Sequence, residues 1–151
     1  MTQLVHPDKV LGDFNDVKLS HNGQDFHLQV ADEMCWAEML DPAAIPGTPA
    51  ASKRVQRPIV MSTGSHHMQA YWFPVGVRRT LGILPFVFLN ETQEWIPRSA
   101  AFLKPSPTGV AHEIGRWNAG CSNCHSTHPQ KRELTFGEFD TQAAEFGISC
   151  E

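Results

Sequence analysis

Five residues near the carboxyl end of the chain carry its most specific chemical signal. Cys121 and Cys124 are separated by two residues and His125 follows directly, which gives the pattern Cys-x-x-Cys-His. This pattern is typical of covalent haem attachment, because two thiols at this spacing can reach the two vinyl groups along one porphyrin edge. The imidazole that follows can then bind the iron. The pattern predicts one haem c, with thioether bonds to Cys121 and Cys124 and with His125 as the proximal iron ligand.

Two other kinds of chemistry use the same pair of cysteines. A structural zinc site needs four ligands, so two further side chains would have to join the two thiols. The candidates are His112, His128 and Cys150, and none of them stands in a second pairing with ligand spacing. A thiol–disulfide pair normally lies between a strand and a helix of a βαβ unit, which the residues before the motif do not indicate. Both alternatives stay open, and the motif favours haem.

Two adjacent histidines are the main candidates for a second axial ligand. His66 and His67 lie in a stretch of small, turn-forming residues. In an extended chain they point to opposite sides, so at most one can reach a given iron. We expect one of them to be an iron ligand and the other to be an ordinary surface or core histidine. His112, His128 and Met68 are further candidates.

The composition describes a folded protein of one-domain length and restricts its partners. The chain has 151 residues, of which 41% are hydrophobic and 19% charged, as in globular proteins. Its net charge is −4 and its Lys and Arg residues form no stripe, so we expect no nucleic-acid partner. No apolar run approaches the roughly 18 residues that a membrane span needs. Residues 1–10 lack the apolar core of a secretory signal. We therefore expect no membrane span and no signal peptide in this chain.

Alternating apolar and polar residues predict strands over about the first hundred residues. Residues 13–32 are typical of a hairpin whose turn is Asn22-Gly23, a dipeptide that readily adopts positive φ. A second hairpin is expected over residues 86–96, where a polar turn separates two apolar runs. Prolines such as Pro85 should keep these strands short or at sheet edges. The isolated Cys35 is expected to be a buried free thiol.

The composition changes after residue 105. Residues 112–130 are rich in His, Cys, Asn and Gly and poor in aliphatic residues, so we expect an irregular segment that folds around a cofactor. A short helix is expected from about residue 140 to residue 146. The expected fold class is α+β, with short antiparallel strands and hairpins followed by an irregular haem-binding segment with short helices. Residues 1–104 would be the β-rich portion and residues 105–151 the c-type haem-binding portion of one incomplete domain.

The order of several short motifs resembles a bacterial family of multihaem cytochromes c, some of whose members carry tetratricopeptide repeats after the haem domain. The resemblance covers most of the chain and is strongest from residue 57 to the end. The motifs, in chain order, are TGSHHMQAYW at 63–72, LPFVF at 84–88, WIPR at 95–98, WNAGCSNCHSTH at 117–128 and AEFGISCE at 144–151.

The resemblance implies roles for residues outside the Cys-x-x-Cys-His motif as well. Cys150 would be the first thioether cysteine of another haem. One of His66 and His67 would be a distal ligand, to this haem or to a neighbouring one. The resemblance also implies that the chain is a fragment of a longer protein with more than one haem, located in the periplasm or otherwise outside the cytoplasm.

Three functions are consistent with these features. The first is electron transfer by a c-type cytochrome, an iron protein whose partners are redox proteins or neighbouring haem domains; this favours a carrier over an enzyme. The second is a multihaem oxidoreductase acting on a small molecule such as a nitrogen oxide, which requires an open axial position on the iron. The third is a zinc-stabilised binding module that uses Cys121 and Cys124.

Overall fold

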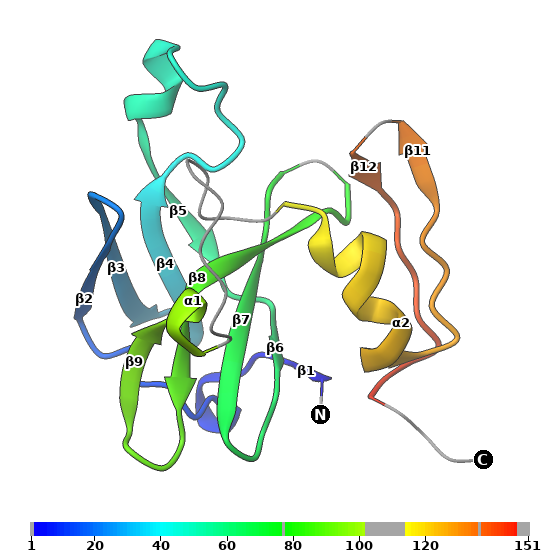
Figure 1. The fold of residues 1–151 in the computed structure, drawn as a ribbon, viewed down its shortest axis with the longest axis horizontal. Coiled ribbons are helices and arrows are strands. Elements are labelled where there is room, and N and C mark those ends of the chain that lie inside the picture. The colour runs from blue at the N-terminus through cyan, green and yellow to red at the C-terminus, as the bar shows by residue number, and fades with distance from the viewer. Residues whose placement is uncertain (1, 77, 102–113, 136, 148–151) are drawn as a thin grey trace.

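The computed structural model describes residues 2–76, 78–101, 114–135 and 137–147. Two antiparallel sheets share one core, and a region of helix and short strands lies beside the larger sheet (Figure 1). The four-stranded sheet contains, in order, β2 (Val17–His21), β3 (Gln24–Ala31), β4 (Met34–Leu40) and β5 (Arg54–Pro58). The five-stranded sheet contains, in order, β1 (Thr2–Leu4), β6 (Met61–Thr63), β7 (Met68–Pro74), β8 (Leu81–Leu89) and β9 (Glu94–Pro97).

Both predicted hairpins are present. β2 and β3 are joined by Asn22-Gly23, whose φ angles of 51° and 73° are the left-handed values that this dipeptide tolerates. β8 and β9 pair in antiparallel register from Leu89 with Glu94 to Phe86 with Pro97. The sequence of residues 42–53, rich in proline and alanine, forms turns and one short 3-10 helix, η2 (Pro49–Ser52).

Aromatic side chains dominate the core between the two sheets. Phe26 on β3 and Phe86 on β8 meet edge to face, with ring centroids 5.2 Å apart. Phe14 meets Tyr71 in the same way, also at 5.2 Å. These contacts bury large apolar surfaces from both sheets, which is the main source of stability for such a sandwich. Cys35 lies in this core as a buried free thiol, as the sequence predicted.

The larger sheet is buried on both faces at β7. Successive side chains of a strand point to opposite faces. Tyr71 and Phe73 therefore belong to the core between the sheets, whereas Trp72 belongs to a second cluster on the other face. That cluster also contains Ile83 and Trp117. Trp117 comes from the region after residue 113, so the second cluster is where that region attaches to the sheet.

The expectation that proline shortens these strands is wrong for Pro85. β8 is nine residues long and lies between β7 and β9, with Pro85 inside it. The register with β7 shifts there, because Ala70 pairs with Val87 but Trp72 pairs with Ile83. Such a bulge leaves ladder positions unpaired, so a residue without an N–H group is tolerated.

Beyond residue 113 the chain is more regular than its composition predicts. A π-helical segment, η3 (Trp117–Cys121), continues directly into α2 (Ser122–His125); we call the two together the motif helix. The expected helix over residues 140–146 is wrong, since these residues are extended. The short strands here are β10 (Ser126–Thr127), β11 (Glu133–Thr135), β12 (Glu138–Phe139) and β13 (Glu145–Phe146), and β10 pairs with β13 and β11 with β12.

The predicted α+β class, with an irregular haem-binding segment and short helices, is therefore wrong. Strands account for 47% of the structure and helices for 16%, so the fold is predominantly antiparallel β. In the described part of the chain, only one helix reaches seven residues. The others are η1 (Pro7–Lys9), η2 and α1 (Arg98–Ala101). The physical reason is that the extended segment 138–147 finds β partners, which the local pattern does not reveal. The division at residue 104 stays a prediction.

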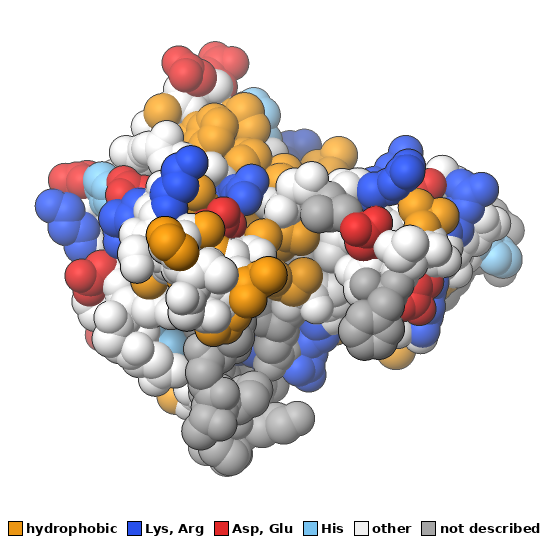
Figure 2. All heavy atoms as spheres, turned by 90° about the horizontal axis from the view of Figure 1, so that it is seen from above, with side chains coloured by type: hydrophobic (Ala, Val, Ile, Leu, Met, Phe, Trp, Pro, Cys, Tyr) orange, Lys and Arg blue, Asp and Glu red, His pale blue; other side chains and the backbone are white. Residues whose placement is uncertain are grey.

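On the face that Figure 2 shows, Lys and Arg side chains are interspersed with Asp and Glu, and apolar side chains gather between them. No helix in the described ranges has the length and hydrophobicity to cross a bilayer.

Candidate functional site

The motif helix is fastened to the larger sheet by one buried amide. The Asn118 side chain is fully buried. Its Oδ1 accepts a hydrogen bond from the backbone N–H of Leu81 at 3.0 Å. Its Nδ2 donates to the carbonyl of Arg79 at 2.9 Å and to the hydroxyl of Thr141 at 2.8 Å. Asn118 therefore ties the helix to the start of β8 and to the extended segment that follows β12.

An indole on the same helix supplies the apolar contact. Trp117 packs on Trp72 of β7, with ring centroids 5.5 Å apart. Met61 and Ile83 complete this cluster, and the half-buried Cys121 packs against it. Trp117 and Cys121 are four residues apart, so they lie on neighbouring turns of one helix face. The sheet thus fixes the rotation of the helix about its own axis.

The carboxyl end of the motif helix is held by the last described strand. The backbone N–H of Gly147 donates to the carbonyl of His125 at 3.0 Å. Ser126 leaves the helix in an extended conformation and pairs with Phe146. Its hydroxyl also donates back to the carbonyl of Ser122 at 2.7 Å. These bonds satisfy carbonyl groups that a helix end leaves free.

The three predicted haem-binding residues share one face of this helix. Cys121 has helical dihedral angles (φ −63°, ψ −34°) and directly precedes α2. Cys124 and His125 follow it by three and four residues, so all three side chains project from the same side. Cys121 is half-buried, whereas Cys124 and His125 are exposed. The His125 ring lies 6.5 Å from the ring of Trp117, centroid to centroid. Both cysteines are free thiols.

This arrangement suits covalent haem attachment. Two accessible thiols one turn apart can bond to one edge of a porphyrin, and the adjacent imidazole can bind its iron. A zinc site needs a third and a fourth ligand close by. Within the described ranges, no group of three His, Cys, Asp or Glu side chains is placed to hold a metal ion. His128, one zinc candidate, is exposed on a turn with φ 47°.

His66 and His67 lie in the turn between β6 and β7, and both are exposed. Their rings are 5.3 Å apart and nearly perpendicular. Asn90 pins this turn, because its side chain donates to the carbonyl of His66 at 3.0 Å and its backbone N–H to that of His67 at 2.9 Å. Gly64, with φ 92°, begins the turn, and a Cβ there would collide with the carbonyl of Met68.

The structure does not group these histidines with the thiols as ligands of one metal. This statement covers the described residues, which include His66, His67, Cys121, Cys124 and His125. His112 and Cys150, by contrast, lie outside the residues that the structure describes. Their predicted roles, as a ligand and as a thioether cysteine, stay predictions.

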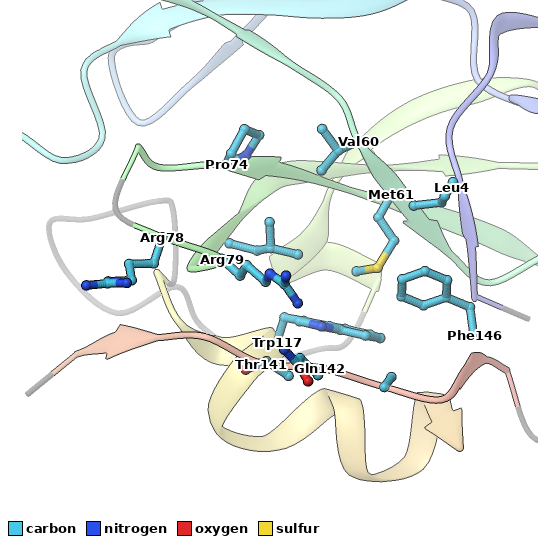
Figure 3. Close-up of a pocket in the computed structure, with 12 residues that line it drawn as sticks. Leu4, Val60, Met61, Pro74, Arg78, Arg79, Trp117, Thr141, Gln142 and Phe146 are labelled. Atoms are coloured by element: carbon cyan, nitrogen blue, oxygen red, sulfur yellow. The ribbon is translucent and has the colours of Figure 1, made fainter. Parts of the chain in front are cut away.

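An open apolar cavity of about 500 Å³ lies between the larger sheet and the extended segment 141–146, and Trp117 of the motif helix also lines it. Figure 3 shows the Trp117 indole along one wall, with the Met61 thioether pointing toward it. Leu4 and Phe146 stand at one end of the cavity and are largely exposed, at 62% and 46%. Sequence reasoning identified neither this cavity nor Asn118. The only local signal was the Trp117-Asn118 pair, which is separated from the motif by two residues.

Comparisons with known proteins add no assignment. No family model matches the chain, and no curated protein and no solved structure matches it significantly.

Proposed function

We propose that this chain is an electron-transfer haem domain of a multihaem c-type cytochrome. Cys121 and Cys124 would hold one haem c covalently, and His125 would bind its iron. The observation that carries the proposal is the single helix face that presents both thiols and the imidazole, with Cys124 and His125 open to solvent. The resemblance of the sequence motifs to multihaem cytochromes c supports the same assignment.

Each residue would have a distinct task. Each thiol would add across one vinyl group, with its sulfur going to the carbon next to the ring and its hydrogen to the terminal carbon, so that attachment would need no oxidant. The imidazole of His125 would bind the iron through its unprotonated nitrogen, with the Trp117 ring as its aromatic neighbour, 6.5 Å away between ring centroids. The bound haem supplies one-electron exchange between ferric and ferrous iron.

In the parent protein we place this domain outside the cytoplasm, together with more than one haem. Neighbouring haem domains or redox proteins would be its partners. One of His66 and His67 would serve as a distal ligand, and Cys150 would begin a further attachment motif. The exposure of both histidines at a pinned turn supports such a role, because the imidazoles are accessible and the backbone beneath them is fixed.

The proposal is tested by exporting the full chain behind an added secretion signal in a host with a haem-attachment system. We expect a pyridine haemochrome spectrum of the thioether type, with one haem per chain. The double variant Cys121→Ala/Cys124→Ala should carry none. The matched control Cys35→Ala, which removes a thiol from the sandwich core, should keep its haem. Stoichiometric zinc without a Soret band would contradict the proposal and favour the zinc module.

Carbon monoxide separates a carrier from an oxidoreductase. A haem with two protein ligands resists carbon monoxide, whereas an open axial position binds it. We expect the reduced protein not to bind carbon monoxide. If His66 or His67 is the distal ligand of this haem, the alanine variant of that residue alone should bind it. Binding by the unmodified protein would favour the oxidoreductase.

A further inference from the structure

The apolar cavity has the character of a small-molecule pocket that is separate from the haem motif. Its volume of about 500 Å³ lies in the range of such pockets, and most of its lining residues are apolar. The Trp117 indole forms one wall, and Leu4 and Phe146 remain largely exposed at one end (Figure 3). Apolar side chains that stay exposed around a hollow mark a surface that a ligand can cover. None of the predicted haem-binding residues lines this cavity.

A positive charge lies away from the exposed apolar end. Arg79 lines the cavity, and Figure 3 shows its side chain directed toward the Trp117 indole, whereas Arg78 is turned away. The Nε atom of Arg79 lies 3.3 Å from Asp140, and Asp140 also lies 3.8 Å from Arg132. Among the described residues, one carboxylate is therefore shared by two guanidinium groups. This part of the cavity keeps a positive charge in excess, which an anionic ligand can neutralise.

The polar groups of the cavity also have hydrogen-bonding capacity to spare. A guanidinium group carries five N–H donors, and Asp140 approaches the Nε side of Arg79. Gln142 lines the same cavity, and its side-chain amide makes no hydrogen bond within the described ranges. A planar carboxylate is the acceptor that best matches a guanidinium fork. An aromatic ring is the apolar group that best matches a flat indole wall.

We propose that this cavity binds a small aromatic carboxylate, whose ring lies against the Trp117 indole and whose carboxylate pairs with Arg79. The proposal goes beyond the haem function and does not depend on it. The side chain of Arg79 is 59% exposed, so water weakens its ion pairs. Most of the affinity therefore comes from the apolar walls, and Arg79 determines the preference for an anion over a neutral compound of the same shape.

The preference for an anion is tested with 2-naphthoate and 2-naphthamide, which share one ring system and differ in charge. The full chain, prepared without haem, is titrated with each compound, and the indole N–H signal of Trp117 is followed by nuclear magnetic resonance. We expect this signal to shift and saturate with 2-naphthoate, and 2-naphthamide to bind about fivefold more weakly. Arg79→Gln should weaken 2-naphthoate to the level of the amide. The matched control Arg78→Gln, which removes the same charge from a side chain turned away, should preserve the preference.

A second variant tests the place of binding. Ala143→Leu narrows the cavity without changing any charge, so it should weaken both compounds by the same factor. Urea denaturation of each variant checks that the fold is kept. Equal affinities for acid and amide, or equal losses in the two arginine variants, would overturn the carboxylate assignment. Full binding by Ala143→Leu, or no saturable shift of the Trp117 signal in the unmodified protein, would overturn the cavity itself.

Discussion

The sandwich core and the region of residues 114–147 are held together by different kinds of contact. Most buried hydrophobic side chains belong to the two sheets, and among the described residues only Trp117 and Phe139 come from the later region. That region instead buries polar side chains: Asn118, Ser122 and Ser126. A region that buries little apolar surface gains little stability by itself. The contrast teaches that the sandwich is stabilised mainly by its own apolar core, while the motif region is positioned by a few polar anchors.

The largest expected effect lies in the sandwich. Phe26→Ala removes an aromatic side chain that is 1% exposed and meets Phe86 at 5.2 Å. We expect a loss of about 3 to 5 kcal/mol in the free energy of unfolding, measured by urea denaturation. Phe146→Ala, at a side chain that is 46% exposed, should cost far less. Equal losses would remove the distinction between the two regions.

The next effect lies at the polar anchor. Asn118→Ala leaves the N–H of Leu81 and the carbonyl of Arg79 without their partner. We expect a loss of about 2 kcal/mol that is confined to the motif helix. Hydrogen exchange should accelerate over residues 117–125 and at the amide of Leu81, which loses its acceptor, and stay unchanged in β7 and in the rest of β8. The matched control is Asn123→Ala, at an exposed position of the same helix. Uniform acceleration over both regions would show that they unfold as one unit.

The smallest effect depends on pH. Burial raises the pKa of the Cys35 thiol from 9.0 to about 11. The folded state therefore holds the thiol neutral, and its stabilising contribution is complete below pH 9 and is lost as the pH rises toward 11. Between pH 8 and pH 10 we expect the free energy of unfolding of the unmodified protein to fall by about 1 kcal/mol more than that of the Cys35→Ala variant. Parallel stability profiles for the two proteins would contradict this. Burial raises the pKa of Tyr71 as well, so the comparison stops at pH 10.

The sandwich was the more predictable of the two regions because its signals are local. Asn22-Gly23 specifies a tight turn, and the alternation on either side specifies the faces of β2 and β3. The prediction that Pro85 keeps its strand short or at an edge was wrong, because the bulge that accommodates this proline arises from the pairing of β8 with β7. The period of a strand alone does not reveal such a shift of register.

The motif region was less predictable because its order comes from distant contacts. The motif helix is fixed by hydrogen bonds from Asn118 to Arg79 and Leu81, about forty residues earlier in the chain. A helix was expected over residues 140–146, but Phe146 pairs with Ser126 and lies in a two-residue strand instead. The spacing of the two cysteines and His125 was legible from the sequence, since it depends on five consecutive residues. The cavity was not, because its walls come from five separate stretches of chain.

The most direct test of the account is the mass of one peptide. The exported chain is digested, and the peptide that contains Cys121 and Cys124 is weighed. Covalent attachment predicts the mass of that peptide plus one haem, with both sulfurs alkylated by the porphyrin and unreactive toward iodoacetamide. A peptide of unmodified mass, with both thiols open to iodoacetamide, would contradict it.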